Sequence, residues 1–417
     1  MENSLICPAR ILLPAEGTDM KKWAALACDQ FTSQPEYWAA ADAFVGDAPS
    51  TLRMILPEVY LEEPDVAART AAAQAAMAEY EKTLLTRCVN GFVYVERTTP
   101  AGNRRGLMAA IDLEAYSYEK GAAPLIRPTE GTVPERIPPR LQVRRAAPLE
   151  LPHILMLLDD PARTVLEPLA AMKADLPLLY DTDLMLEGGH IAGWAVEDAA
   201  LIESLCAAVN AFAEKPSPGG RPPIAIAVGD GNHSLATAKA HWEELKAALP
   251  AEQLAGHPAR YALAEIENIH DEAILMEPIH RAVFGADADA LAADMRAFFA
   301  ARKGEQPPQT FTLVRPDGEE RPFAIPHPAQ PLCVGSVEAF FAAWLPAHPE
   351  ARVDYIHGAD AVHQLAGQGA VVMILPDFEK DDLFRGVYLG GVLPKKTFSM
   401  GHATEKRYYM EARRIRG

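Results

Sequence analysis

Residues 229–234 read Gly-Asp-Gly-Asn-His-Ser, and the segments on either side of them decide the fold. Residues 223–228 form a short apolar run, which predicts a buried strand. Residues 235–242 are apolar at helical spacing and rich in good helix formers. Glycine permits the sharp reversal with positive φ that such a connection needs. The stretch therefore predicts a strand, a tight turn and a helix, in that order.

A turn of this kind also suits an anion. Backbone N–H groups and the positive end of the helix dipole would face a bound phosphate or carboxylate. Asp230 and Asn232 are turn and N-cap residue types whose side chains can bond amides of the first helical turn. The spacing matches neither the P-loop nor the dinucleotide fingerprint, so an ordinary connecting turn is the alternative. The anion-binding hypothesis assigns the site to Gly229, Asp230, Gly231, Asn232, His233 and Ser234, with Asp230 also able to bind a metal ion.

Composition narrows the class of protein. The chain has 417 residues, enough for two or three domains. Its formal net charge of −18 argues against a nucleic-acid partner. The five cysteines contain no Cys-x-x-Cys pair, which is typical of a reducing compartment. Because no signal segment or membrane-length apolar run is present, we expect a cytoplasmic protein without a membrane partner; no oligomeric state is predicted.

Periodicity predicts an α+β fold. Strands and helices alternate irregularly, which favours mixed sheets with flanking helices over a regular doubly wound sheet. Helices are predicted over 66–88, 197–214, 235–249 and 288–302, and strands over 91–96, 106–111, 154–158, 310–314, 353–356, 371–375 and 385–389. We expect a main α/β domain over 1–302, which carries the turn, and a smaller C-terminal α/β region over 303–417 with a basic tail.

Two further segments carry candidate site residues. Arg127 and Glu130 lie in a stretch without helical or strand period, and arginine suits phosphate or carboxylate recognition. His280 and Arg281 follow an apolar run and could bind an anion or relay a proton. A salt-bridged loop and a hydrogen-bonded structural histidine are the respective alternatives. Asp29 is a candidate Mg²⁺ ligand, because Mg²⁺ needs one or two carboxylates plus ligand phosphates.

The tail is locally basic within an acidic protein. Residues 394–414 contain several lysines and arginines, too few for a nucleic-acid arm. We expect this segment to fold back, either over an anionic ligand or against acidic surface. An amphipathic helix with Tyr409, Met410 and Ile415 as its packing face is the alternative.

The turn and its helix resemble a bacterial and archaeal family catalogued as domain of unknown function 1015. Members carry a strand, an Asp-Gly-His-His-Arg turn and an alanine-rich helix. Further blocks of this sequence resemble that family in the same order; they are Ala27–Gln30, Arg127–Thr132, Pro278–Arg281 and Leu393–Thr397.

The Asp-Gly-x-His turn also resembles the phosphate-binding turn of the ParB/sulfiredoxin-like superfamily, which includes free-serine kinases. This resemblance implies a ParB/sulfiredoxin-like core and nucleotide phosphates at the helix N-terminus, with Asp230, Gly231 and His233 carried over. Ser234 stands where those relatives place arginine. Arg127, Arg281 or Lys239 would then have to supply the missing positive charge.

These observations lead to a functional prediction. We expect nucleotide-dependent phosphoryl transfer, from ATP or ADP with Mg²⁺, to a small hydroxyl-bearing metabolite such as free serine. His233 and an arginine, either Arg127 or Arg281, would neutralise the charge on the transferred group, and Asp29 or Glu130 would accept the hydroxyl proton. The residues around the nucleotide would be Gly229, Asp230, Gly231, Asn232, Ser234, Arg127 and His280. A non-catalytic sensor of nucleotides or other anions is the alternative. A hydrolase with His233 or His280 as base ranks last, because no nucleophile lies at a supporting spacing.

Overall fold

The computed structural model describes residues 4–303 and 306–416, which form two compact units. Unit 1 comprises the described residues of Met1–Pro128, Thr132–Ile274 and His402–Gly417, and unit 2 comprises Thr129–Gly131 and those of Leu275–Gly401. The expected boundary at 302/303 therefore differs from this division. Strand β12 (Met276–Phe284) pairs with strands of unit 2, which moves the division to residue 274. Gly304 and Glu305, beside the expected boundary, lie outside the described residues.

Unit 1 is built on a ten-stranded mixed sheet in which β10 runs parallel to β5 and antiparallel to β7. Its strands are β1 (Ile6–Cys7), β2 (Ala9–Leu13), β3 (Arg87–Thr99), β4 (Gly102–Asp112), β5 (Ile126–Pro128), β7 (Leu155–Leu158), β8 (Leu178–Asp183), β9 (His190–Val196), β10 (Ile226–Asp230) and β11 (Tyr261–Asn268), and β6 (Leu149–Glu150) pairs separately with β18 (Arg413–Arg414). Its helices are α1 (Met20–Trp23), α2 (Pro35–Val45), α3 (Val66–Thr83), α4 (Ile137–Ala146), α5 (Leu166–Met172), α6 (Ala199–Asn210) and α7 (Asn232–Ala248). The α+β prediction is confirmed.

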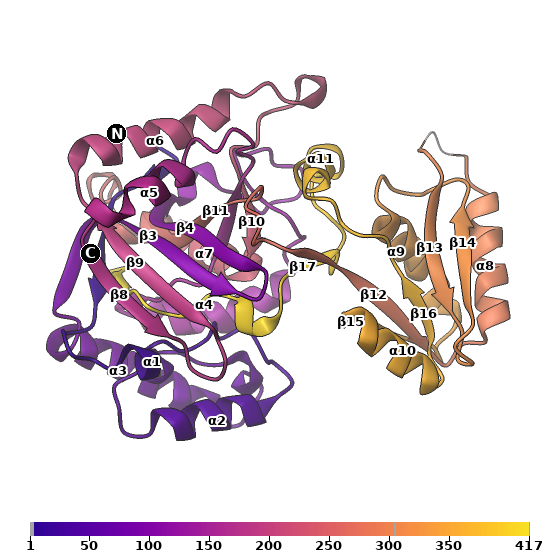
Figure 1. The fold of residues 1–417 in the computed structure, drawn as a ribbon, viewed down its shortest axis with the longest axis horizontal. Coiled ribbons are helices and arrows are strands. Elements are labelled where there is room, and N and C mark those ends of the chain that lie inside the picture. The colour runs from indigo at the N-terminus through magenta and orange to yellow at the C-terminus, as the bar shows by residue number, and fades with distance from the viewer. Residues whose placement is uncertain (1–3, 304–305, 417) are drawn as a thin grey trace. The chain divides into compact units, whose positions relative to one another are not determined.

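Apolar residues cover both faces of this sheet. On one face, Phe92 and Leu107 pack with residues of α5, α6 and α7. On the other, Val93 and Met108 pack with residues of α2 and with Tyr408. Figure 1 shows α5 and α6 on one side of β3 and β9 and α2 on the other. The alternation of side chains along β3 and β4 thus makes this sheet the centre of unit 1.

The last described residues complete unit 1 from the distant end of the sequence. Leu12 and Ala412 exchange backbone hydrogen bonds, and the Ala27 N–H donates to the Arg407 carbonyl at 2.9 Å. The Trp23 indole N–H donates to the Met410 carbonyl at 3.0 Å. The tail therefore folds back as expected, but in an extended form, so the alternative of an amphipathic helix is wrong.

Unit 2 has a six-stranded sheet with the order β14-β13-β16-β12-β15, and β17 pairs with the start of β12. Its remaining strands are β13 (Gln309–Val314), β14 (Glu320–Ile325), β15 (Arg352–His357), β16 (Val371–Ile374) and β17 (Phe398–Met400), and its helices are α8 (Ala288–Ala300), α9 (Cys333–Trp344), α10 (Ala359–Gly367) and α11 (Lys380–Gly390). The predicted strand at 385–389 is wrong, because these residues form part of α11. Among the described residues, no helix combines the length and apolarity needed to cross a bilayer.

Candidate functional site

The predicted strand, turn and helix are present as β10, Gly231 and α7. Gly231 has a φ of 81° and is the N-cap residue, so no side chain caps α7. A Cβ atom added at Gly231 would lie 3.0 Å from the Ile154 Cα, which is a second reason for glycine here. Gly229 lies at an irregularity in the pairing of β10 with β7. Gly231, and neither Asp230 nor Asn232, is therefore the N-cap residue, and α7 begins at Asn232.

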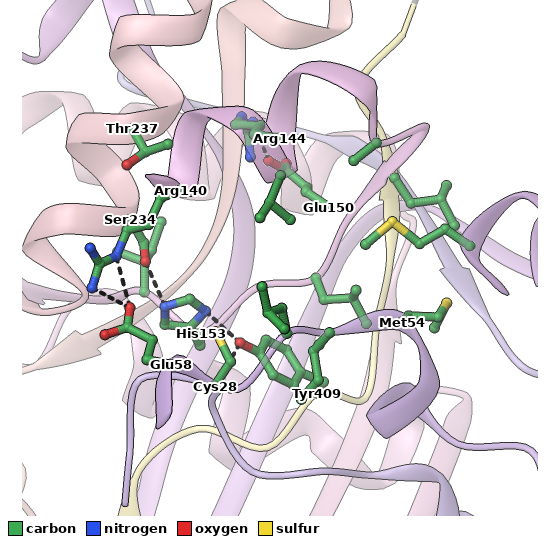
Figure 2. Close-up of a pocket in the computed structure, with 18 of the residues that line it drawn as sticks. Cys28, Met54, Glu58, Arg140, Arg144, Glu150, His153, Ser234, Thr237 and Tyr409 are labelled. Carbon is green, nitrogen blue, oxygen red and sulfur yellow. Dashed lines mark hydrogen bonds and ion pairs between the residues drawn. The ribbon is translucent and has the colours of Figure 1, made fainter. Parts of the chain in front are cut away.

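Ser234, in the first turn of α7, lines a cavity of about 160 Å³ within unit 1. Most of the wall is apolar and includes Met54, Leu56, Met77 and Leu149. Figure 2 shows that polar side chains gather around Ser234. They are Cys28, Glu58, Arg140, His153 and Tyr409. The cavity thus has a polar end next to the N-terminus of α7, and Arg144 and Glu150 line another part of its wall as an ion pair.

Hydrogen bonds connect the residues of this polar end. The Ser234 hydroxyl and His153 Nε2 are 2.7 Å apart, and His153 Nδ1 is 2.8 Å from the Tyr409 hydroxyl (Figure 2). The Cys28 backbone N–H donates to the same tyrosine oxygen at 3.1 Å. Arg140 Nε donates to the Glu58 carboxylate at 2.7 Å. Both nitrogens of the His153 ring are therefore engaged.

Burial sets the protonation of several groups here. It raises the pKa of the Cys28 thiol and of the Tyr409 hydroxyl, so both stay neutral near pH 7. It also raises the pKa of Glu58, against the lowering effect of the Arg140 guanidinium. A neutral thiol is a poor nucleophile. Cys28 is therefore unsuited to covalent chemistry in this cavity.

Two predicted acidic residues lie near the polar end or the turn. Asp29 Oδ2 is 3.7 Å from His153 Nε2. Asp230 Oδ2 is 3.2 Å from the Nζ of Lys406, a nearly buried cation in the tail. Within the residues that the structure describes, Asp230 belongs to no group of three or more candidate metal ligands. In this structure its carboxylate pairs with Lys406.

The other predicted residues of the turn have structural contacts. His233 Nε2 accepts a hydrogen bond from the Val133 N–H at 3.3 Å, and its carbonyl accepts one from the Thr237 hydroxyl at 2.7 Å. Arg127 is nearly buried and donates to the carbonyls of Pro124, Pro222 and, at 3.4 Å, Pro223. Arg127 therefore ties β5 to the loop before β10.

Three further predicted site residues lie in unit 2, namely Glu130, His280 and Arg281. Arg281 is fully buried, and its Nε donates to Glu338 at 2.9 Å. His280 Nδ1 accepts from the Leu375 N–H at 3.2 Å, and burial lowers the pKa of its imidazole. Glu130 accepts from the Lys396 N–H at 3.0 Å.

No sequence motif predicts a site role for His153, Glu58 or Tyr409. His153 precedes β7 without a recognisable motif, and Glu58 lies in a short 3-10 turn. Tyr409 was considered only as a packing residue. The position of Pro-His before an apolar strand is the one local signal that could have drawn attention to His153.

A family model matches most of the chain. Residues 12–339 match the family model described as "Protein of unknown function (DUF1015)", and the chain belongs to that family. No curated protein matches the chain.

Solved structures show distant similarity to this chain. A conserved hypothetical protein from Pyrococcus furiosus shares 14% identity at a TM-score of 0.35, covering 74% of this chain and 95% of that one. A free serine kinase in complex with AMP shares 12% identity at a TM-score of 0.37, covering 74% and 91%. A mutant free serine kinase in complex with ADP shares 13% identity at a TM-score of 0.39, covering 74% and 92%. Similarities at these TM-scores carry no argument about the site.

Proposed function

We propose that this protein transfers a phosphoryl group from ATP or ADP to the hydroxyl of a small metabolite such as free serine. The observation that carries the proposal is the N-terminus of α7, which has glycine instead of a capping side chain and adjoins the polar end of a cavity. Helix N-termini of this kind bind phosphates through backbone N–H groups and the helix dipole. The resemblance of the turn to that of ParB/sulfiredoxin-like proteins agrees with this role.

Lys406 is the best-placed cation for the phosphates. It lies 3.2 Å from Asp230, the residue just before Gly231. Arg127 is less suitable, because its guanidinium already donates to backbone carbonyls. Arg281 and His280 are occupied by contacts within unit 2. We therefore assign to Lys406 the charge that the absent arginine at position 234 would have supplied.

Asp29 is the proposed acceptor of the hydroxyl proton. It lies beside the polar end of the cavity and contacts His153. A carboxylate in this position can orient and deprotonate an alcohol, which is most of what phosphoryl transfer requires of a protein. Mg²⁺ would arrive with the nucleotide as part of the substrate. Asp230 would be its protein ligand, since Mg²⁺ on phosphates needs only one or two carboxylates.

Calorimetry on two matched variants tests nucleotide binding. Asn232→Asp places a carboxylate in the first turn of α7, where phosphates would lie, whereas Ala199→Asp adds the same charge to the exposed first turn of α6. Both changes suit a helix N-terminus, so neither should destabilise the fold. We expect Asn232→Asp to weaken ADP or ATP binding by about tenfold or more, through repulsion of the phosphates, and Ala199→Asp to leave it unchanged.

Turnover is then measured with pooled hydroxy amino acids, ATP or ADP, and Mg²⁺. Phosphorylated product that is lost in Asp29→Asn supports the proposed enzyme. Nucleotide binding without product from any acceptor would favour the sensor. Absence of nucleotide binding by the parent protein would refute both.

A further inference from the structure

Ser234 and His153 form a hydrogen-bonded pair of a kind that phosphate binding does not require. Their Oγ and Nε2 atoms are 2.7 Å apart, within the range expected of a nucleophile and its base. Figure 2 shows both side chains at the polar end of the cavity. They come from the start of α7 and from the segment before β7. The strand–turn–helix position of Ser234 is related to the one that exposes the nucleophile in many hydrolases, although Ser234 lies in the helix itself.

Tyr409 fixes the ring of His153. Its hydroxyl is 2.8 Å from His153 Nδ1, and the two rings meet edge to face with centroids 5.6 Å apart. The tyrosine oxygen is itself held by the Cys28 N–H. When Nδ1 carries the ring proton and donates it to Tyr409, Nε2 is left as the acceptor for the Ser234 proton. Tyr409 is thus a positioning residue, in the place of the carboxylate of a catalytic triad.

Two acidic residues lie near the His153 ring. Asp29 Oδ2 lies 3.7 Å from Nε2, and the charge of Glu58 also acts on this imidazole. A negative charge close to a histidine stabilises the imidazolium that forms when the serine proton is removed. Ser234 also lies near the positive end of the α7 dipole, which favours an oxyanion at its hydroxyl.

The rest of the cavity indicates the substrate. Its apolar wall includes Met54, Leu56, Leu61, Met77 and Leu149. A volume of about 160 Å³ is close to that of protein cavities that bind benzene, so a group of about six carbons fits. This apolar part of the wall suits an uncharged aliphatic or aromatic group. Arg144 and Glu150 also line the cavity, but their charges are paired with each other at 2.6 Å.

We infer that Ser234 and His153 hydrolyse an ester whose acyl group, of about six carbons, occupies the cavity. His153 Nε2 takes the hydroxyl proton while Ser234 Oγ bonds to the carbonyl carbon, and the carbonyl electron pair moves to its oxygen. Collapse breaks the bond to the alcohol, which leaves with the proton from His153. Water then attacks the acyl-serine, again through His153, and releases the acid and a free serine hydroxyl. This activity does not depend on nucleotide binding.

A fluorophosphonate probe with a short alkyl chain tests the nucleophile on the full chain. We expect one covalent adduct, mapped to Ser234 by mass spectrometry. Ser234→Ala should abolish the adduct, and His153→Gln should slow its formation about 100-fold, as loss of a general base does. Ser117→Ala is the control, because Ser117 is a half-buried serine whose hydroxyl accepts from a backbone N–H. Absence of an adduct at Ser234 in the parent protein would overturn the inference.

A second variant, Ser234→Cys, tests the role of His153 even where His153→Gln does not fold. In Ser234→Cys, His153 should activate the new thiol, so that iodoacetamide alkylates it about tenfold faster than the exposed Cys88 of the same molecule. Equal or slower alkylation would contradict the role of His153. Tyr409→Phe should move the pH dependence of fluorophosphonate labelling, which a purely structural tyrosine would not do.

The acyl pocket has its own test. Hydrolysis of p-nitrophenyl esters from acetate to decanoate should reach its highest kcat/KM near hexanoate. A kcat/KM that does not vary with chain length would refute the assignment of the cavity. Because these assays contain no nucleotide, their failure is distinguishable from failure of the proposed phosphoryl transfer.

Discussion

Arginine–glutamate pairs with both side chains buried lie inside unit 1, whereas aromatic rings fill much of the interior of unit 2, where the buried Arg281 meets a partly exposed Glu338. In unit 1, Arg407 lies 3.2 Å from Glu265, with exposed side-chain fractions of 2% and 1%. Arg104 and Glu267 form another buried pair at 2.7 Å. In unit 2, Phe340 packs against neighbouring rings of α8 and α9, including Phe299 and Trp344.

The two interiors differ in how strictly they fix the positions of the segments that form them. Aromatic packing gains free energy roughly in proportion to buried area and tolerates modest rearrangement. A buried ion pair gains little net energy but is costly to break, because each partner left alone is an unpaired buried charge. The charges of unit 1 therefore fix the position of the tail, since Arg407 must meet Glu265 and Arg413 must meet Glu150. That position also places Tyr409 against His153.

Removal of the Arg407 charge from the interior of unit 1 should give the largest loss of stability. Arg407→Met leaves Glu265 and Glu411 without their cation in the core. We expect the free energy of unfolding of unit 1 to fall by about 3–5 kcal/mol. Urea titration followed by tryptophan fluorescence measures it in a Trp344→Phe background, because the other four tryptophans lie in unit 1. Adding Glu265→Gln and Glu411→Gln should recover part of the loss, and a loss near zero in the single variant would contradict the argument.

A smaller effect is expected from the pH dependence of the stability of unit 1. His241 on α7 is buried, and its Nδ1 has no hydrogen-bond partner among the described residues. Burial lowers the pKa of His241 from 6.5 to about 4. Between these pH values the unfolded chain therefore binds a proton that the folded chain does not bind. Stability is thus complete above pH 6.5 and is lost as the pH falls towards 4. Between pH 7.5 and 5 the loss should be about 2 kcal/mol.

Two histidine variants isolate this contribution. His241→Leu should remove that part of the pH dependence in the same urea titrations, whatever its effect at pH 7.5. His327→Leu, at an exposed position of unit 2, should leave the pH dependence of unit 1 unchanged. Identical pH profiles for the parent and His241→Leu would show that His241 does not titrate as proposed.

The smallest effect is expected at the surface of unit 2. Arg315 pairs with the exposed Asp289 at 2.5 Å. Solvent and salt screen such a pair, so it adds little to stability. Arg315→Met should leave the unfolding midpoint of unit 2, followed by Trp344 fluorescence, within experimental error. A shift as large as that of Arg407→Met in unit 1 would remove the distinction between the two units.

Local pattern predicted much of the fold. β10 and α7 were predicted because an apolar run, glycine and a helical period follow one another within about twenty residues. The same approach failed at 385–389, where valine, tyrosine and leucine suggested a strand. In α11, Leu383, Phe384 and Val387 are buried at helical spacing, and two aspartates occupy the first turn. The helical period and the favourable charges prevailed over β propensity.

The sequence predicted only one of the segments that form the candidate site. Ser234 belongs to the local motif, but its partner His153 lies 81 residues earlier, and Tyr409 lies 256 residues after His153. No local period links these positions, because pairing of the sheet and return of the tail bring them together. The contact of Lys406 with Asp230 could not be predicted for the same reason, because the sequence showed only that the tail is basic.

The return of the tail also orders events during translation. Except for residues 129–131, unit 2 is one continuous run that the ribosome completes before it reaches Arg407 and Tyr409. At usual elongation rates this run takes on the order of ten seconds to make. Throughout that interval a nascent unit 1 holds Glu265 without its cation and His153 without its tyrosine. The polar end of the cavity can therefore be completed only after unit 2 has been synthesised, so earlier translation intermediates contain Ser234 and His153 without the hydrogen bond from His153 to Tyr409.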